Sequence, residues 1–67
     1  MKWVRVNRAH FNASLITAFY WSMGRLYVYW QGEPDADPYD DADRKNYLGL
    51  CHCLGVKPIE EDGDGKS

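Results

Sequence analysis

The stretch from residue 14 to residue 31 constrains the fold more than any other part of this 67-residue chain; it reads SLITAFYWSMGRLYVYWQ. It holds six of the ten aromatic residues, and its β-branched and aromatic side chains are typical of strands. The triplet Ser22-Met23-Gly24 interrupts it, and a glycine there can adopt the left-handed backbone that tight hairpin connections need. The stretch therefore predicts a β-hairpin that the rest of the chain has to cover.

Two registers of this hairpin are compatible with the sequence. A three-residue loop over residues 22–24 has the better turn chemistry and pairs Trp21 with Arg25. A two-residue turn at 24–25, or a four-residue loop, buries more apolar area and exchanges the two faces of the first strand. Phe19 and Trp21 face outward in the first register and inward in the second. Both registers agree on the second strand: Leu26, Val28 and Trp30 inward, Arg25, Tyr27 and Tyr29 outward.

The flanking segments predict one further strand and one helix. Residues 3–7 read WVRVN and alternate in polarity with the period of a strand. A helix is expected over residues 38–54, because Asp37 suits the N-cap, Pro38 the first helical position and Gly55 the left-handed residue that ends a helix. Its apolar stripe, expected to face the sheet, consists of Tyr47, Leu50, Cys51 and Leu54.

Together these elements predict an α+β fold of the order β-β-β-α, a three-stranded antiparallel meander with one C-terminal helix packed on one face. A small, partly open SH3-like barrel with a C-terminal helix is the alternative. We expect residues 1–57 to form one small domain, since a chain of this length is near the lower limit for folding alone. Residues 58–67 end in EEDGDGKS and predict a disordered acidic tail.

Charge is divided unevenly along the chain, whose net charge is −2. Residues 1–32 carry four of the eight cationic residues and no acid, and all ten acids follow residue 32. The overall charge argues against a general nucleic-acid or membrane binder, while the basic first half suits a local anionic partner. The N-terminus has no apolar core of a secretory signal, and residues 15–30 are too short to span a bilayer. We therefore expect a reduced cytoplasmic protein without membrane association.

The outer face of the sheet is the predicted binding site, because one helix covers only one face. Side chains expected there are Trp3, Arg5, Arg25, Tyr27 and Tyr29, joined by Tyr20 or by Phe19 and Trp21 according to the register. Aromatics interleaved with arginines suit a protein interface, and they also suit stacking on single-stranded bases. We expect a protein-interaction module of the kind found in bacteria, phages or mobile elements, which binds a partner protein or forms a homodimer. A single-stranded nucleic-acid binder is the alternative.

An acidic run over residues 33–43 is a second candidate surface. In the simpler interpretation its first acids end a strand, its later ones cap the helix, and the rest are solvated. In the other interpretation, four carboxylates form an electronegative edge that docks on a basic surface, as an inhibitor or nucleic-acid mimic would: Asp35, Asp37, Asp40 and Asp41.

The triplet Cys51-His52-Cys53 gathers side chains that elsewhere bind metals or act as nucleophiles. On a helix the two sulfurs are about 200° apart around the axis, so they do not converge on one ion. His52 likewise points away from both cysteines, and neither a phosphate-binding glycine loop nor a catalytic carboxylate pair is present. We therefore expect no metal, no cofactor and no enzymatic activity.

Two short resemblances accompany this interpretation. Residues 26–35 read LYVYWQGEPD and resemble the central strand of chromodomains, which implies a chromo-like partly open barrel and a methyl-lysine cage including Tyr27 or Trp30. Residues 14–20 with 26–30 are similar to the opening of the small bacterial KTSC domains. The N-terminal segment and downstream N-T-W-E-P-like run of chromodomains are missing here. So is the strand that KTSC domains place after their glycine.

Overall fold

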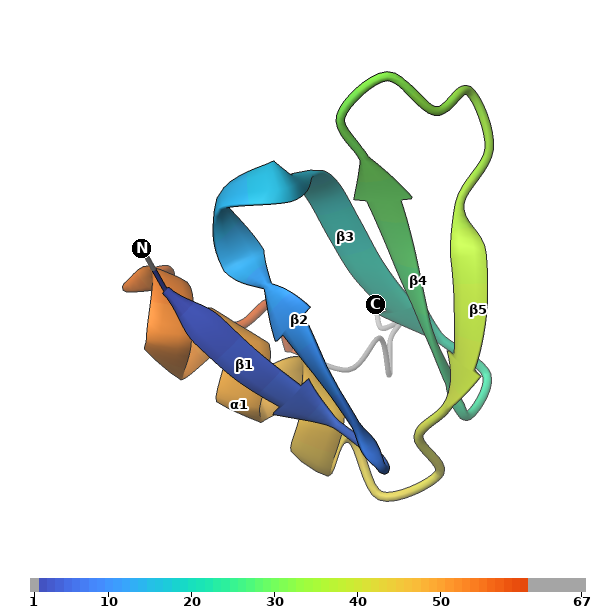
Figure 1. The fold of residues 1–67 in the computed structure, drawn as a ribbon. Coiled ribbons are helices and arrows are strands. Elements are labelled where there is room, and N and C mark those ends of the chain that lie inside the picture. Colours follow the sequence, from blue (N-terminus) through green and yellow to red (C-terminus); the bar gives the residue numbers. More distant parts are fainter. Residues whose placement is uncertain (1, 61–67) are drawn as a thin grey trace.

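The computed structural model describes residues 2–60, which form five strands, one 3₁₀ turn and one α-helix (Figure 1). In chain order they are β1 (Trp3–Val6), β2 (Ala9–Asn12), η1 (Ala13–Leu15), β3 (Ile16–Ser22), β4 (Arg25–Trp30), β5 (Asp37–Asp40) and α1 (Lys45–Leu54). The strands make two antiparallel sheets, β1-β2 and β3-β4-β5. The predicted α+β class with antiparallel pairing and a C-terminal helix is confirmed, and the strands are divided between two sheets rather than one.

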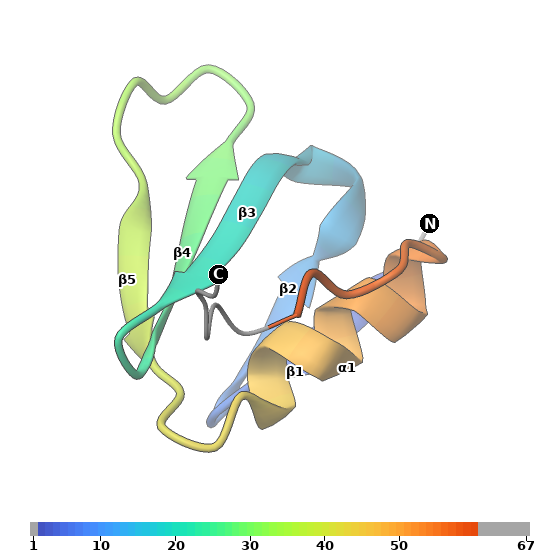
Figure 2. The same cartoon turned by 180° about the vertical axis from the view of Figure 1, so that it is seen from behind.

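The core lies between the two sheets and the helix. Hairpin β1-β2 and helix α1 both lie on one side of the β3-β4-β5 sheet (Figures 1 and 2). The ring of Phe11 on β2 links the sheets, because its centroid is 5.2 Å from that of Trp30 and 5.2 Å from that of Tyr39. The buried apolar residues come from both sheets, the 3₁₀ turn and the helix: Val4, Val6, Ala13, Leu26, Val28, Tyr47, Leu50 and Cys51.

The β3-β4 hairpin adopts the register that places Phe19 and Trp21 inward. Trp21 pairs with Leu26 and Ser22 with Arg25, so the three-residue loop register is wrong. The two-residue turn consists of Met23 and Gly24, with φ of 51° and 83°, one residue earlier than the predicted turn at 24–25. A left-handed methionine costs roughly 1–2 kcal/mol. Full burial of such a side chain contributes about 1.5–3 kcal/mol, and Phe19 and Trp21 are both partly buried, so together they offset the strained turn.

The helix begins at Lys45 and not at residue 38, so the N-terminal part of the predicted helix is wrong. Residues 37–40 instead form β5, which pairs with β4. Proline is tolerated in an edge strand such as this one, and the strand places Tyr39 against Phe11. The predicted helix end is confirmed: Gly55 has φ of 71°, and its N–H and that of Val56 donate to carbonyls of the last turn.

Asp41 joins the start of the helix to the hairpin. Its carboxylate accepts hydrogen bonds from the backbone N–H of Asn46 (2.9 Å) and of Tyr47 (2.8 Å). Its carbonyl accepts from Trp21 Nε1 (2.8 Å), and its own N–H donates to the Gly24 carbonyl (2.9 Å). The first helical N–H groups lack partners within a helix, so this side chain satisfies two of them and fixes the helix relative to β3 and β4.

Candidate functional site

The outer side of the β3-β4-β5 sheet carries a cluster of tyrosines that we call the tyrosine face: Tyr20, Tyr27 and Tyr29, with Arg25. The rings of Tyr20 and Tyr27 are stacked, with centroids 4.8 Å apart and planes at 15°. The Tyr29 ring lies 6.4 Å from that of Tyr20. Tyr20 is 44% exposed, Arg25 is exposed, and the other two tyrosines are half-buried.

The alternation of β4 creates this face. Leu26 and Val28 point into the core, so Arg25, Tyr27 and Tyr29 point the other way. Tyr20 joins them because it lies directly opposite Tyr27 in the observed register. Among residues 2–60, the helix and hairpin β1-β2 both lie on the opposite side of the sheet, which leaves this side uncovered (Figures 1 and 2).

Trp3 and Arg5 lie on a separate surface, because β1 pairs with β2 and not with the main sheet. The sequence predicts no strand where β2 lies, and it therefore misses His10, which is opposite Arg5 on the same side of the hairpin. We call Trp3, Arg5 and His10, together with Arg8 in the connecting turn, the hairpin face. All four residues are exposed. The predicted binding set is thus divided between two surfaces.

The acidic residues of 33–43 do not form one continuous edge. Asp35, Asp37 and Asp40 are exposed, whereas Asp41 is only 3% exposed and its carboxylate serves the helix start. Asp37 lies at the beginning of β5, and its negative charge affects the ionisation of Tyr39 on the same strand. Burial, and next the charge of Asp37, raise the pKa of the Tyr39 phenol above its usual value of 10.0.

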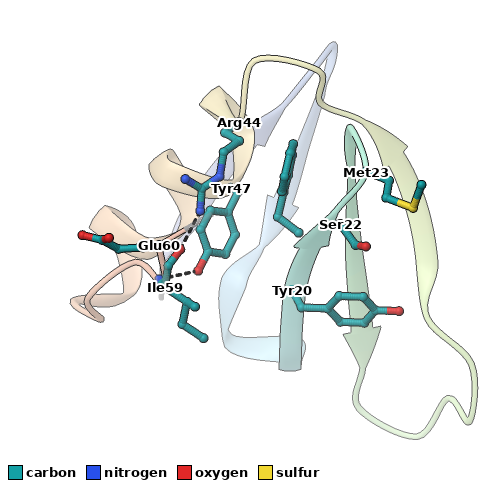
Figure 3. A pocket seen from close by; sticks show the side chains of 8 residues that line it. Tyr20, Ser22, Met23, Arg44, Tyr47, Ile59 and Glu60 are labelled. Atoms are coloured by element: carbon teal, nitrogen blue, oxygen red, sulfur yellow. Dashed lines mark hydrogen bonds between the residues drawn. The ribbon is translucent and has the colours of Figure 1, made fainter. Parts of the chain in front are cut away.

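A hollow of about 480 Å³ lies between the β3-β4 turn and the start of α1 (Figure 3). The Arg44 guanidinium is 5.1 Å from the centre of the Trp21 ring and 5.0 Å from that of Tyr47. Its Nη2 donates to the Ile59 carbonyl (2.6 Å), and Ile59 N–H donates to the Tyr47 hydroxyl (2.9 Å). Figure 3 shows the Tyr20 ring pointing away from Arg44 and Tyr47.

Arg44 has a structural function in this hollow. Its backbone is left-handed (φ of 63°), and its buried Nε has no hydrogen-bond partner. The charge is compensated by two aromatic faces, a cation–π arrangement, while Nη2 holds residue 59 against the helix. The hollow therefore contains a guanidinium between two aromatic rings. Among the described residues that line it, no nucleophilic side chain is hydrogen-bonded to a base. The sequence gives no sign of this hollow, because the predicted helix over residues 38–54 places Arg44 inside the helix and outside its apolar stripe.

The Cys51-His52-Cys53 triplet lies on α1 with its side chains in different surroundings. Cys51 is buried in the core, His52 is exposed, and Cys53 is half-buried with its Sγ 4.0 Å from the Trp3 carbonyl. Both cysteines are free thiols. Within residues 2–60 no group of three or more His, Cys, Asp or Glu side chains is placed to hold a metal ion.

No helix in the described part of the chain has the length and apolar character needed to cross a bilayer. Comparison of the chain with models of known protein families, with curated proteins and with solved structures finds no match. The resemblances to chromodomains and KTSC domains therefore rest on the short runs of residues quoted for them.

Proposed function

We propose that this protein is a small protein-interaction module that binds through the tyrosine face, and that its partner is a second copy of the chain. One observation supports this most strongly: on the uncovered side of the main sheet the Tyr20 ring stacks on that of Tyr27 and lies beside that of Tyr29. Tyrosine is enriched in protein interfaces, where its ring contributes contact area and its hydroxyl retains a polar partner.

The stacked arrangement also lowers the cost of binding. A side chain that is already ordered loses little rotamer freedom when a partner covers it, so more of the contact energy appears as affinity. Tyr20 and Tyr27 restrict each other by stacking, and Tyr29 lies beside them. The face is therefore organised before binding.

Charge on this face favours a second copy. Arg25 on β4 lies opposite Asp40 on β5 in the same register, and both are exposed. A two-fold interface places each patch against its own copy, so a patch that carries one cation and one anion can pair crosswise with itself. Another protein with aromatic and mixed-charge character is the alternative partner.

Sedimentation equilibrium of the purified chain over a concentration series tests this proposal. We expect the wild type to form a dimer of the 7.8 kDa chain, and Tyr27→Ser with Tyr29→Ser to shift it to monomer without loss of fold. The matched control replaces Trp3 and Arg5 by serine, which should leave the dimer intact. Unfolding of the tyrosine variant would instead show that these rings hold the sheet together.

Two other functions fit the tyrosine face and the acidic residues less well. A single strand of nucleic acid needs several cations beside the stacking rings, and Arg25 is the one cation within the tyrosine face. An acidic inhibitor or nucleic-acid mimic would rely on Asp35, Asp37 and Asp40 alone, since Asp41 is buried. We place the module in the cytoplasm, where its two free thiols would stay reduced.

A further inference from the structure

We infer that the hairpin face is a second binding surface, and that it binds single-stranded nucleic acid. This inference does not depend on the tyrosine face. The surface consists of the outward side chains of the β1-β2 hairpin, Trp3, Arg5 and His10, with Arg8 in the turn. Val4 and Val6 occupy the opposite side and are buried, so the outward side is free of any structural demand from the core.

The first argument is charge. Residues 2–12 contain Lys2, Arg5, Arg8 and His10 and no acid, and all four are exposed. Lys2 Nζ donates to the Cys53 carbonyl at the end of the helix (3.1 Å), so Lys2 is directed toward the helix and the face itself carries two cations, Arg5 and Arg8. A row of cations without an intervening carboxylate attracts phosphates, and the release of counterions supplies affinity.

The second argument is the position of Trp3. Its side chain is 57% exposed, although tryptophan contributes most to stability when it is buried. It lies two residues from Arg5 on the same side of β1, about 6.6 Å along the strand. An exposed indole beside guanidinium groups can stack on a base while the cations contact the backbone.

The third argument is the orientation of Arg5. Its Nε donates to the Asn7 carbonyl (2.9 Å), and that bond uses one of the five N–H donors of the guanidinium. The bond fixes the plane of the group relative to the hairpin. A guanidinium held in this way contacts a phosphate with a smaller loss of side-chain freedom than a free arginine.

The hairpin face fits nucleic acid better than an anionic membrane. Insertion into the lipid interface requires a broad apolar area, whereas Trp3 is surrounded by polar side chains on this face. Asn12 lies directly opposite it on β2, and His10 lies opposite Arg5. Binding to vesicles without binding to the oligonucleotide is therefore a result that would contradict the inference, and the experiment includes it.

Fluorescence anisotropy of a fluorescein-labelled oligo(dT), titrated with the full chain, tests the inference. With two cations engaged, we expect log K to fall against log salt with a slope of about −1.4, so that raising salt from about 50 to 200 mM weakens binding roughly sevenfold. Trp3→Ala should weaken binding by about tenfold or more, and Trp3→Phe should restore most of the loss. Arg5→Gln should reduce the slope by about 0.7.

Met23→Ala is the matched control, because it removes an exposed apolar side chain that belongs to neither face and should leave oligo(dT) affinity unchanged. Three results would overturn the inference. They are no binding at low salt, equal weakening by Met23→Ala and Trp3→Ala, and binding of phosphatidylserine vesicles without binding of the oligonucleotide. An intact amide spectrum of Trp3→Ala, expected for so exposed a residue, shows that its loss of binding is not a loss of fold.

Discussion

Removing the charge of Asp41 should destabilise this protein more than any comparable change among its acidic residues. The carboxylate is buried and accepts two backbone hydrogen bonds at the start of α1, from Asn46 and Tyr47. Hydrogen bonds to a charged group contribute about 1.5–3 kcal/mol, and loss of a helix cap costs about 0.5–2 kcal/mol. Asp41→Asn keeps one acceptor oxygen and turns an amide N–H₂ toward the second donor, so we expect a loss of about 2 kcal/mol.

For a domain of this size the whole net stability is of the order of 3–5 kcal/mol, so the loss is a large fraction of it. Urea unfolding followed by tryptophan fluorescence measures it. With an m-value of about 1 kcal/mol per molar urea, the midpoint should fall by about 2 M. The control is Asp35→Asn, the same chemical change at an exposed residue outside the tyrosine face, where we expect almost no shift. Equal midpoints for the two variants would refute the assignment of Asp41 as the anchor of the helix.

Three further predictions concern the turn, the hollow and the pH dependence. Met23→Asn should raise the free energy of unfolding by about 0.5–1 kcal/mol, because asparagine tolerates the left-handed backbone better than methionine. The methionine side chain is 93% exposed, so its removal costs little packing, and thermal unfolding measures the gain. Arg44→Ala should lower the free energy of unfolding by about 1–2 kcal/mol, because the cation–π contacts are lost. Arg44→Gly should lower it less than Arg44→Ala, because glycine relieves the left-handed strain. The reverse order of the two variants in urea unfolding would contradict this. The pKa of Tyr39 is higher in the folded protein than in the unfolded chain. Its contribution to stability is therefore fully present below about pH 10 and is lost as pH rises through the folded-state pKa. Tyr39→Phe should reduce this loss, which urea midpoints measured from neutral to alkaline pH would show.

The features that the sequence predicts correctly are those with strong local causes. The second strand of the hairpin alternates between apolar and polar or aromatic residues, which assigns Leu26 and Val28 to the core and Tyr27 and Tyr29 to the outside. Gly55 ends the helix because the residue after the last helical turn adopts a left-handed backbone, which glycine does without strain. The buried stripe of Tyr47, Leu50 and Cys51 follows from helical spacing.

The errors concern pairings between distant segments. Asp37-Pro38 suits a helix start, yet the same residues suit an edge strand, which here is held by pairing with β4 and by the contact of Tyr39 with Phe11. The β1-β2 hairpin has a single local sign, Asn7, which adopts a left-handed backbone in its turn. The sequence assigns β1 to the main sheet, and it therefore predicts Trp3 and Arg5 on the face of Tyr27 and Tyr29, whereas β1 pairs with β2.

The most direct test of the proposed function is an isotope-filtered NOE experiment on a mixture of labelled and unlabelled chains. Such an experiment reports only contacts between different molecules. The proposal predicts intermolecular NOEs from the ring protons of Tyr20, Tyr27 and Tyr29, and their disappearance on dilution. An absence of intermolecular NOEs at millimolar concentration, or NOEs confined to the hairpin face or the helix, would contradict it.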